Sequence, residues 1–124
     1  AVMDSPGWWA AIGCAVLLLI VEAAIWGIVS IAAEGLGRNR AAGIRLPSLM
    51  RSDAAWHAGH RAARRVMRPL LIAAAVVAIV SVPAQLILVL YVVLLGLSLA
   101  TTLAALVVGA VSASRAANSV PRDD

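Results

Sequence analysis

The residue with the most unusual surroundings in this sequence is Glu22, a single acid in the middle of the apolar stretch 8–33. A charged carboxylate at the centre of a bilayer costs about 2.5 to 3.5 kcal/mol, so Glu22 should face other helices, find a hydrogen-bond donor or stay protonated. Candidate partners within the chain are Ser30, Gln85 and Ser98, and a second chain is another. The alternative interpretation is an acid that carries protons or contacts a ligand.

A second group of chemically capable residues is the arginine cluster between Gly37 and Arg68, which holds eight of the ten arginines in a chain without lysine. A guanidinium can donate two parallel hydrogen bonds to a phosphate or carboxylate, so Arg45, together with Arg38 or Arg40, could bind anionic lipid headgroups. Beside apolar stretches, such a cluster favours contact with lipid over contact with nucleic acid.

Asp53, His57 and His60 would lie within about 60° of one another on a helix, a spacing compatible with a metal ion. No fourth ligand is evident, so the sequence predicts neither a metal nor another cofactor. It also contains no nucleophile with a positioned base and no phosphate-binding loop, and an enzyme is therefore not expected. The single cysteine, Cys14, is interpreted as a small buried apolar residue, with a lipidated or redox-active thiol as the alternative.

The composition indicates what must position these residues. Of 124 residues, 63% are hydrophobic, which is too many for an ordinary soluble domain. Residues 69–113 carry no charge and would be about 67 Å long as one helix, more than twice the thickness of a bilayer core. They should fold back at 81–85, where Pro83 removes a backbone donor. We therefore expect a single-domain, all-α membrane protein with spans at about 8–33, 69–82 and 85–113.

The polar loop 34–68 is expected in two parts. Gly43 and Pro47 indicate an ordered turn, and Ser52 is a suitable N-cap for a helix that has Asp53 in its first turn. One face of that helix would carry Trp56, Gly59, His60, Ala63, Val66 and Met67. The opposite face would carry Arg61, Arg64, Arg65 and Arg68. This pattern predicts an amphipathic, basic helix at the membrane interface, followed by a bend at Pro69.

Two further expectations concern the packing and the orientation of the spans. Ser98, Thr102, Ala105 and Gly109 form a stripe of small residues, which favours close approach of a neighbouring helix over the lining of a pore. Because arginine-rich loops remain in the cytoplasm, the loop 34–68 and the C-terminus are expected inside and the N-terminus outside.

The loop also carries a spaced motif. Asn39-x3-Gly43-x-Arg45-x-Pro47, followed by Ser52-Asp53-x2-Trp56-x2-Gly59-His60-Arg61, resembles the membrane domain of the SdpI family. These are bacterial membrane proteins named after an immunity protein against a secreted killing toxin. The resemblance implies a helix, a cytoplasmic loop with this motif and two more helices, in the bacterial plasma membrane. It also makes the motif residues candidate binding residues, namely Asn39, Gly43, Arg45, Pro47, Ser52, Asp53, Trp56, His60 and Arg61.

From the chemistry of the motif we expect a folded cytoplasmic cap on the three helices, built from Asn39, Gly43, Arg45, Trp56, His60 and Arg61. The polar residues expected within the membrane are Glu22 and Gln85. The leading functional hypothesis is a membrane protein of the SdpI type that acts by binding a toxin-like peptide or another membrane protein. The alternative is an accessory subunit of a larger membrane complex, or a chain that pairs with itself. Ion or proton transport through Glu22 is a weaker third hypothesis.

Overall fold

The structure is a computed structural model that describes residues 5–39 and 41–121, so Arg40, one of the candidate headgroup contacts, lies outside the described residues. Its helices are α1 (Trp8–Glu34), α2 (Pro47–Met50), α3 (Asp53–Ala84) and α4 (Leu88–Asn118). Strands are absent from the described residues. The expected all-α class is confirmed.

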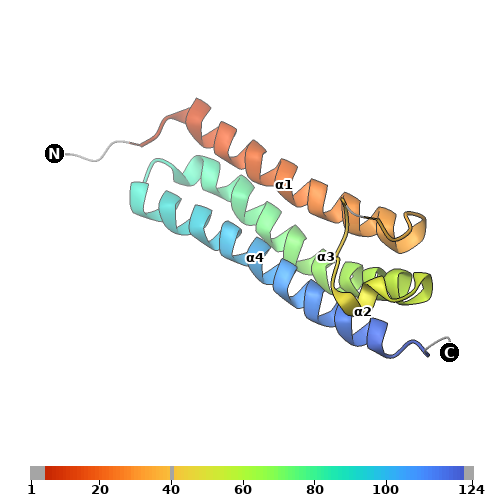
Figure 1. Cartoon of the computed structure of the whole chain (residues 1–124). Coiled ribbons are helices and arrows are strands. Elements are labelled where there is room, and N and C mark those ends of the chain that lie inside the picture. The colour runs from red at the N-terminus through yellow and green to blue at the C-terminus, as the bar shows by residue number, and fades with distance from the viewer. Residues whose placement is uncertain (1–4, 40, 122–124) are drawn as a thin grey trace.

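The three long helices lie side by side and alternate in direction (Figure 1). The central helix is α3, which packs against α4 along one side and against α1 along the other. The loop after α1 and the short helix α2 cover one end of this bundle, beside the start of α3 and the end of α4. All the segments that carry the sequence motif therefore meet at the same end.

Each long helix is long and apolar enough to cross a membrane. With 27 residues, α1 is about 40 Å long, which exceeds a hydrocarbon core of about 30 Å. Large apolar side chains are exposed over the outside of all three helices, such as Leu17 on α1, Ile72 on α3 and Val107 on α4. Lipid is the solvent in which such a surface is stable. Cys14 is also exposed, so its interpretation as a buried residue was wrong.

The segment between the first two spans differs from the prediction at Pro69. Instead of ending before Pro69, α3 continues from Asp53 to Ala84 with Pro69 inside it, so a separate interfacial helix is not confirmed. The basic segment 53–68 is the first half of α3, and the predicted span 69–82 is its second half. Proline removes only one backbone hydrogen bond, and Met67 and Leu71 on either side of it are buried in the core. Packing on both sides therefore keeps the two halves in one helix.

The turn between the second and third spans lies where the sequence predicted it. The last residue of α3 is Ala84, with Gln85 as its C-cap, and α4 begins at Leu88. The third helix extends to Asn118, beyond the predicted end at residue 113. Its last turn is held by Arg51, whose Nη2 donates 2.6 Å to the carbonyl oxygen of Ala117.

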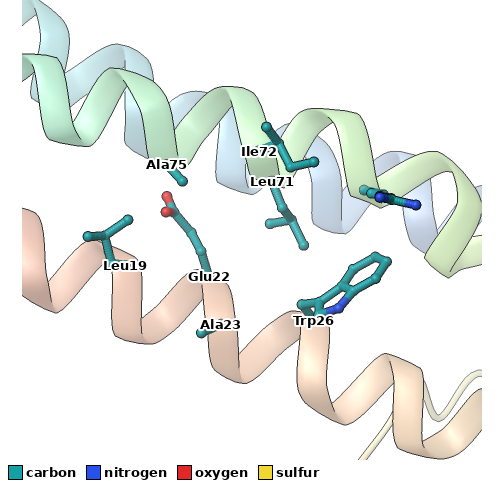
Figure 2. Close-up of a pocket in the computed structure, with 8 residues that line it drawn as sticks. Leu19, Glu22, Ala23, Trp26, Leu71, Ile72 and Ala75 are labelled. Atoms are coloured by element: carbon teal, nitrogen blue, oxygen red, sulfur yellow. The ribbon is translucent and has the colours of Figure 1, made fainter.

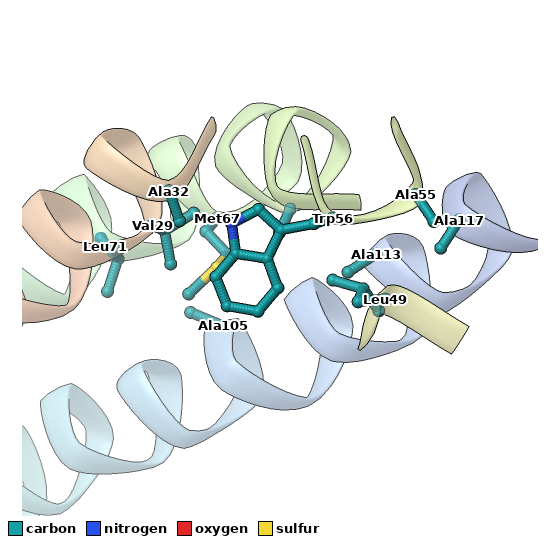
Figure 3. Packing of buried hydrophobic residues seen from close by; sticks show 11 residues of the cluster. Val29, Ala32, Leu49, Ala55, Trp56, Met67, Leu71, Ala105, Ala113 and Ala117 are labelled. Atoms are coloured by element: carbon teal, nitrogen blue, oxygen red, sulfur yellow. The ribbon is translucent and has the colours of Figure 1, made fainter. Parts of the chain in front are cut away.

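The core lies between α3 and α4, with Val29 and Ala32 of α1 packed against it, and is closed at one end by α2 (Figure 3). Small residues allow this close packing, and all four members of the predicted stripe on α4 are buried. A Cβ added to Gly109 would lie 2.7 Å from Cγ of Met67 on α3, which leaves no room for a larger residue. The stripe is therefore a helix–helix contact within the chain, as predicted from its small residues.

Candidate functional site

The loop after α1 is ordered by Asn39. Its side-chain oxygen accepts hydrogen bonds from the backbone N–H groups of Ala41 and Ala42, at 2.9 and 2.7 Å. Its amide nitrogen donates to the carbonyl oxygen of Gly37 at 2.9 Å. An asparagine that bonds its own backbone in this way replaces a backbone turn. The role of Asn39 is thus to shape the segment that leads into Gly43.

Gly43 lies against two aromatic side chains from the first turns of α3. Its φ is +100°, a conformation that residues with a Cβ rarely adopt. A Cβ at this position would lie 2.7 Å from Cη2 of Trp56 and 3.0 Å from Nε2 of His60. The rings of Trp56 and His60 are themselves in contact, with centroids 4.3 Å apart. Glycine is therefore required here both by the backbone conformation and by the space available.

His60 and Trp56 tie the loop to α3 through hydrogen bonds. Nε1 of Trp56 donates 2.7 Å to the carbonyl oxygen of Leu36. Nε2 of His60 accepts from the N–H of Ile44 at 2.8 Å, and Nδ1 lies 2.8 Å from the carbonyl oxygen of Trp56. Since a carbonyl oxygen only accepts, the proton of the neutral ring is on Nδ1. Both ring nitrogens are engaged, so His60 has no nitrogen left to bind a metal.

Burial of His60 lowers the pKa of its ring below the ordinary value of 6.5. Desolvation of the charged form is the largest cause, and nearby His57 lowers the pKa further. The hydrogen bond to the backbone of Trp56 acts in the opposite direction but is a smaller effect. A proton on Nε2 would also oppose the N–H of Ile44. The cap is therefore built around a neutral histidine.

Two further contacts hold the start of α3. The Ser52 side chain accepts a hydrogen bond from the N–H of Ala55 at 3.0 Å, as expected for an N-cap. Arg38 reaches Asp53 with its Nε at 3.0 Å and donates from Nη1 to the carbonyl oxygen of Met50 at 2.8 Å. Asp53 is therefore occupied by an arginine of the loop. Among the described residues, no cluster of three or more His, Cys, Asp or Glu side chains has the geometry of a metal site.

The structure thus brings Asn39, Gly43, Trp56 and His60 into one folded cap. The other candidates on the motif lie at its surface. Pro47 is the first residue of α2 and is exposed. Arg45 and Arg61 are also exposed, and neither forms an ion pair with a described acid. The buried part of the motif holds the loop in place, and its exposed arginines remain available for contacts.

A second polar cluster lies within the apolar part of the bundle. Glu22 of α1 is only 4% exposed, and its Oε2 accepts from the hydroxyl of Thr102 at 3.0 Å. The hydroxyl of Ser98 is 3.4 Å from the same oxygen and donates more closely, at 2.7 Å, to the carbonyl oxygen of Ala74. The Glu22 side chain of α1 thus reaches α4, at the height in the bundle where Ala74 and Ala75 of α3 lie.

The other carboxyl oxygen of Glu22, Oε1, is buried and has no hydrogen-bond partner among the described residues. Glu22 projects from α1 toward Ala75 of α3 (Figure 2). It lines a groove between these helices with a volume of about 500 Å³, which we call the α1–α3 groove. The other lining residues are mostly apolar, namely Leu19, Ala23, Trp26, Arg68, Leu71, Ile72 and Ala75. One acceptor in an apolar groove suits a partner that is hydrophobic except for a hydrogen-bond donor.

Comparison with protein-family models then gives the family. The model of the SdpI/YfhL protein family matches residues 36–113, which is more than half of the chain. The chain belongs to this family. Comparisons with curated proteins and with solved structures found no match.

Only part of the polar cluster around Glu22 lies within the residues matched to the SdpI/YfhL family. The match begins after α1, so Glu22 lies outside the matched residues, whereas Ser98 and Thr102 lie inside them. Ser98 was among the partners expected for Glu22. Thr102 was expected only as part of the small-residue stripe. The sequence signal that could have identified it as a partner of Glu22 is its hydroxyl group, one helical turn from Ser98. Gln85 is buried at the end of α3, with its Oε1 unpartnered among the described residues.

Other contacts of the SdpI/YfhL cap were not expected from the sequence. Leu49 is fully buried and touches Gly59, where an added Cβ would lie 2.6 Å from its Cδ2. The hydroxyl groups of Ser48 and Ser114 are 3.1 Å apart and join α2 to α4. The apolar Leu49 within a polar loop was the only signal of this docking. These contacts fix α2, and with it the loop, against α3 and α4.

Proposed function

We propose that this member of the SdpI/YfhL family is a small membrane binding protein that recognises a peptide or membrane-protein partner through the α1–α3 groove. The buried, unpartnered Oε1 of Glu22 supports this proposal most directly. A buried acceptor without a partner costs about 1 to 3 kcal/mol, so a donor from a ligand would recover that energy. The groove is lined mainly by apolar side chains of α1 and α3, so it suits an apolar peptide segment that is soluble in the surrounding lipid.

The proposal includes an orientation. The loop with the arginine cluster and the end of α4 lie at one end of the bundle (Figure 1), and the positive-inside rule places that end in the cytoplasm of a bacterial cell. The N-terminus is then outside. Arg45→Cys in a Cys14→Ser background tests the orientation, because Arg45 is exposed on the loop. Labelling of intact cells by an impermeant maleimide would contradict it.

A test of the binding function compares Glu22→Gln with Glu34→Gln. Both changes remove one carboxylate from α1, but Glu34 is exposed and lies outside the groove. Cells that express the wild-type protein or either variant are challenged with membrane-active peptides. We expect protection by the wild type and by Glu34→Gln, and loss of protection with Glu22→Gln. Equal protection by both variants would remove Glu22 from the site.

The second candidate function, an accessory subunit, is favoured by a different surface. A groove of about 430 Å³ between α1 and α4 is almost entirely apolar and is lined by Cys14, Leu17, Leu18, Val92, Leu95, Gly96 and Leu99. Such a groove suits a neighbouring transmembrane helix. Here Gly96→Leu is the informative variant, since an added Cβ at Gly96 meets nothing within 4 Å and the chain itself does not use that space.

Purification in mild detergent separates the two functions. A membrane protein that copurifies in stoichiometric amounts with the wild type and is lost with Gly96→Leu supports the accessory role. A lone chain or homodimer that still protects cells supports the binding role. A wild-type chain that neither protects cells nor retains a partner contradicts both functions.

A further inference from the structure

A second pocket lies beside the α1–α3 groove, toward the capped end of the bundle. It has a volume of about 690 Å³ and is lined by Trp26 and Ser30 of α1 and by Arg61, Arg64, Arg65 and Arg68 of α3. We call it the arginine pocket. The four arginines fall within two turns of α3, on a face that differs from the one with the buried Trp56 and His60. The pocket thus gathers four guanidinium groups.

The positive charge of the arginine pocket is only partly compensated. Arg64 forms an ion pair with Glu34 at the end of α1. Arg61, Arg65 and Arg68 have no acid within ion-pair distance in the part of the chain that the structure describes. Like charges held together in this way repel one another, so an anion that bound among them would stabilise the arrangement.

Ser30 gives an independent indication of a ligand. Ser30 is one of the residues that line the arginine pocket, and its hydroxyl oxygen is buried and has no hydrogen-bond partner among the described residues. Most serines in apolar helices bond a carbonyl of the preceding turn, as Thr101 does with the carbonyl oxygen of Leu97 at 2.8 Å. The Ser30 hydroxyl is therefore an unpartnered donor on a residue that lines a pocket of guanidinium donors. Such a set of donors matches the oxygens of a phosphate group.

The position of the pocket indicates where that phosphate comes from. Trp26 and Arg68 line both the arginine pocket and the apolar α1–α3 groove, so the polar and apolar parts are continuous. Because α1 exceeds the hydrocarbon thickness by about 10 Å, the residues near its end reach the headgroup layer. A tryptophan at that boundary is typical of a membrane interface. The pocket thus opens at the depth where lipid phosphates lie.

From these observations we propose that the arginine pocket binds the phosphate of an anionic phospholipid. Arg61, Arg65 and Arg68 supply the charge, and Ser30 donates a hydrogen bond. The acyl chains remain in the bilayer. This proposal does not rest on the binding function assigned to Glu22, because Arg61, Arg65 and Ser30 line the arginine pocket but not the α1–α3 groove, although Arg68 lines both.

The test is a lipid titration of the full chain in detergent, followed by native mass spectrometry. Phosphatidylglycerol, phosphatidic acid and the zwitterionic phosphatidylcholine are compared as probes. We expect the two anionic lipids to bind more tightly than phosphatidylcholine. Arg65→Gln should weaken phosphatidylglycerol binding about fivefold, and its matched control is Arg115→Gln. Arg115 is also exposed and lies in the last turn of α4, outside the pocket, so the control should change binding by less than about twofold.

Ser30→Ala separates a built site from diffuse attraction, because it changes no charge. We expect about threefold weaker binding of phosphatidylglycerol, the effect of one lost hydrogen bond. Unchanged binding with Ser30→Ala, together with equal losses for Arg65→Gln and Arg115→Gln, would overturn the site. Equal binding of the three lipids would also overturn it. Displacement of phosphatidylglycerol by millimolar inorganic phosphate would show that a soluble phosphate is the ligand and would overturn the lipid assignment.

Discussion

Replacement of Gly43 by alanine is the sharpest test of the cap. The new Cβ would lie 2.7 and 2.9 Å from two carbon atoms of the Trp56 ring and 3.0 Å from Nε2 of His60. The φ of +100° costs a residue with a Cβ about 1 to 3 kcal/mol, and overpacking of a rigid site costs about 1 to 3 kcal/mol more. Since rigid aromatic rings cannot move aside easily, we expect Gly43→Ala to lower the free energy of unfolding by about 2 to 6 kcal/mol.

The assay is equilibrium unfolding in mixed micelles with increasing SDS, followed by circular dichroism. Gly37→Ala is a matched control from the same loop, because an added Cβ there meets nothing within 4 Å. Hydrogen exchange of the Trp56 indole N–H, which is bonded to the carbonyl oxygen of Leu36, reports local opening of the cap. Exchange should be much faster in Gly43→Ala than in Gly37→Ala, even if the three long helices stay folded.

Two results would contradict the packing of the loop on α3. If Gly43→Ala and Gly37→Ala unfold at the same SDS fraction and protect the Trp56 indole equally, the loop does not pack on α3 as described. A loss of stability without faster indole exchange would place the effect elsewhere in the chain. In either case the motif would have a role other than closing the end of the bundle.

Three further outcomes follow from the same contacts. The pKa of His60 is lowered in the folded protein and is near 6.5 in the unfolded chain, so the unfolded state binds more protons below that pH. The free energy of unfolding should keep its full value above pH 6.5 and fall below it by at most about 1.4 kcal/mol per pH unit. Unfolding titrations at several pH values should show that His60→Gln loses this dependence. Thr102→Val removes the hydroxyl that donates to Glu22 at 3.0 Å. A double-mutant cycle with Glu22→Leu should give a coupling free energy of about 0.6 kcal/mol and at most about 1.7 kcal/mol, and a coupling of zero would mean that the two side chains are not in contact. Gly109→Ala should lower the free energy of unfolding by about 1 to 3 kcal/mol, because the new Cβ would meet the Met67 side chain. The double variant with Met67→Ala should be more stable than the sum of the two single losses predicts, and strict additivity would contradict the contact.

Much of the helical framework could be predicted from local signals. The turn near Pro83 followed from the length of an uncharged segment and the thickness of a bilayer. The separation of α3 into an aromatic face and an arginine face followed from helical periodicity. The prediction failed at Pro69, because the preference of the residue before a proline is a local bias and α3 is packed against neighbours on both sides of it.

The candidate site was predictable in part. A glycine in the loop predicted an unusual backbone conformation at Gly43, but its contact with Trp56 joins residues far apart in the sequence. The need of Glu22 for a polar partner followed from the cost of a buried charge. The choice of Thr102 depended on how far α1 is shifted along α4, which is set by packing between helices and leaves no local signal. Arg45 and Arg61, which were expected in the cap from the chemistry of the motif, are exposed at the surface.

The hydrogen bonds around Glu22 have a consequence for the order in which the chain assembles. Ser98 donates to Ala74 and Thr102 can donate to the carbonyl oxygen of Ser98, so the α3–α4 hairpin satisfies its own hydroxyl groups before α1 docks. Glu22 has no such alternative on an isolated α1, yet α1 is synthesised before α3 and α4. It must therefore enter the bilayer before Thr102 is available to its acid, at a cost of about 2.5 to 3.5 kcal/mol that its leucine, isoleucine and valine side chains have to outweigh. Biogenesis thus depends on the apolar surplus of α1, and extra polar substitutions in α1 should impair membrane insertion before they impair the folded protein.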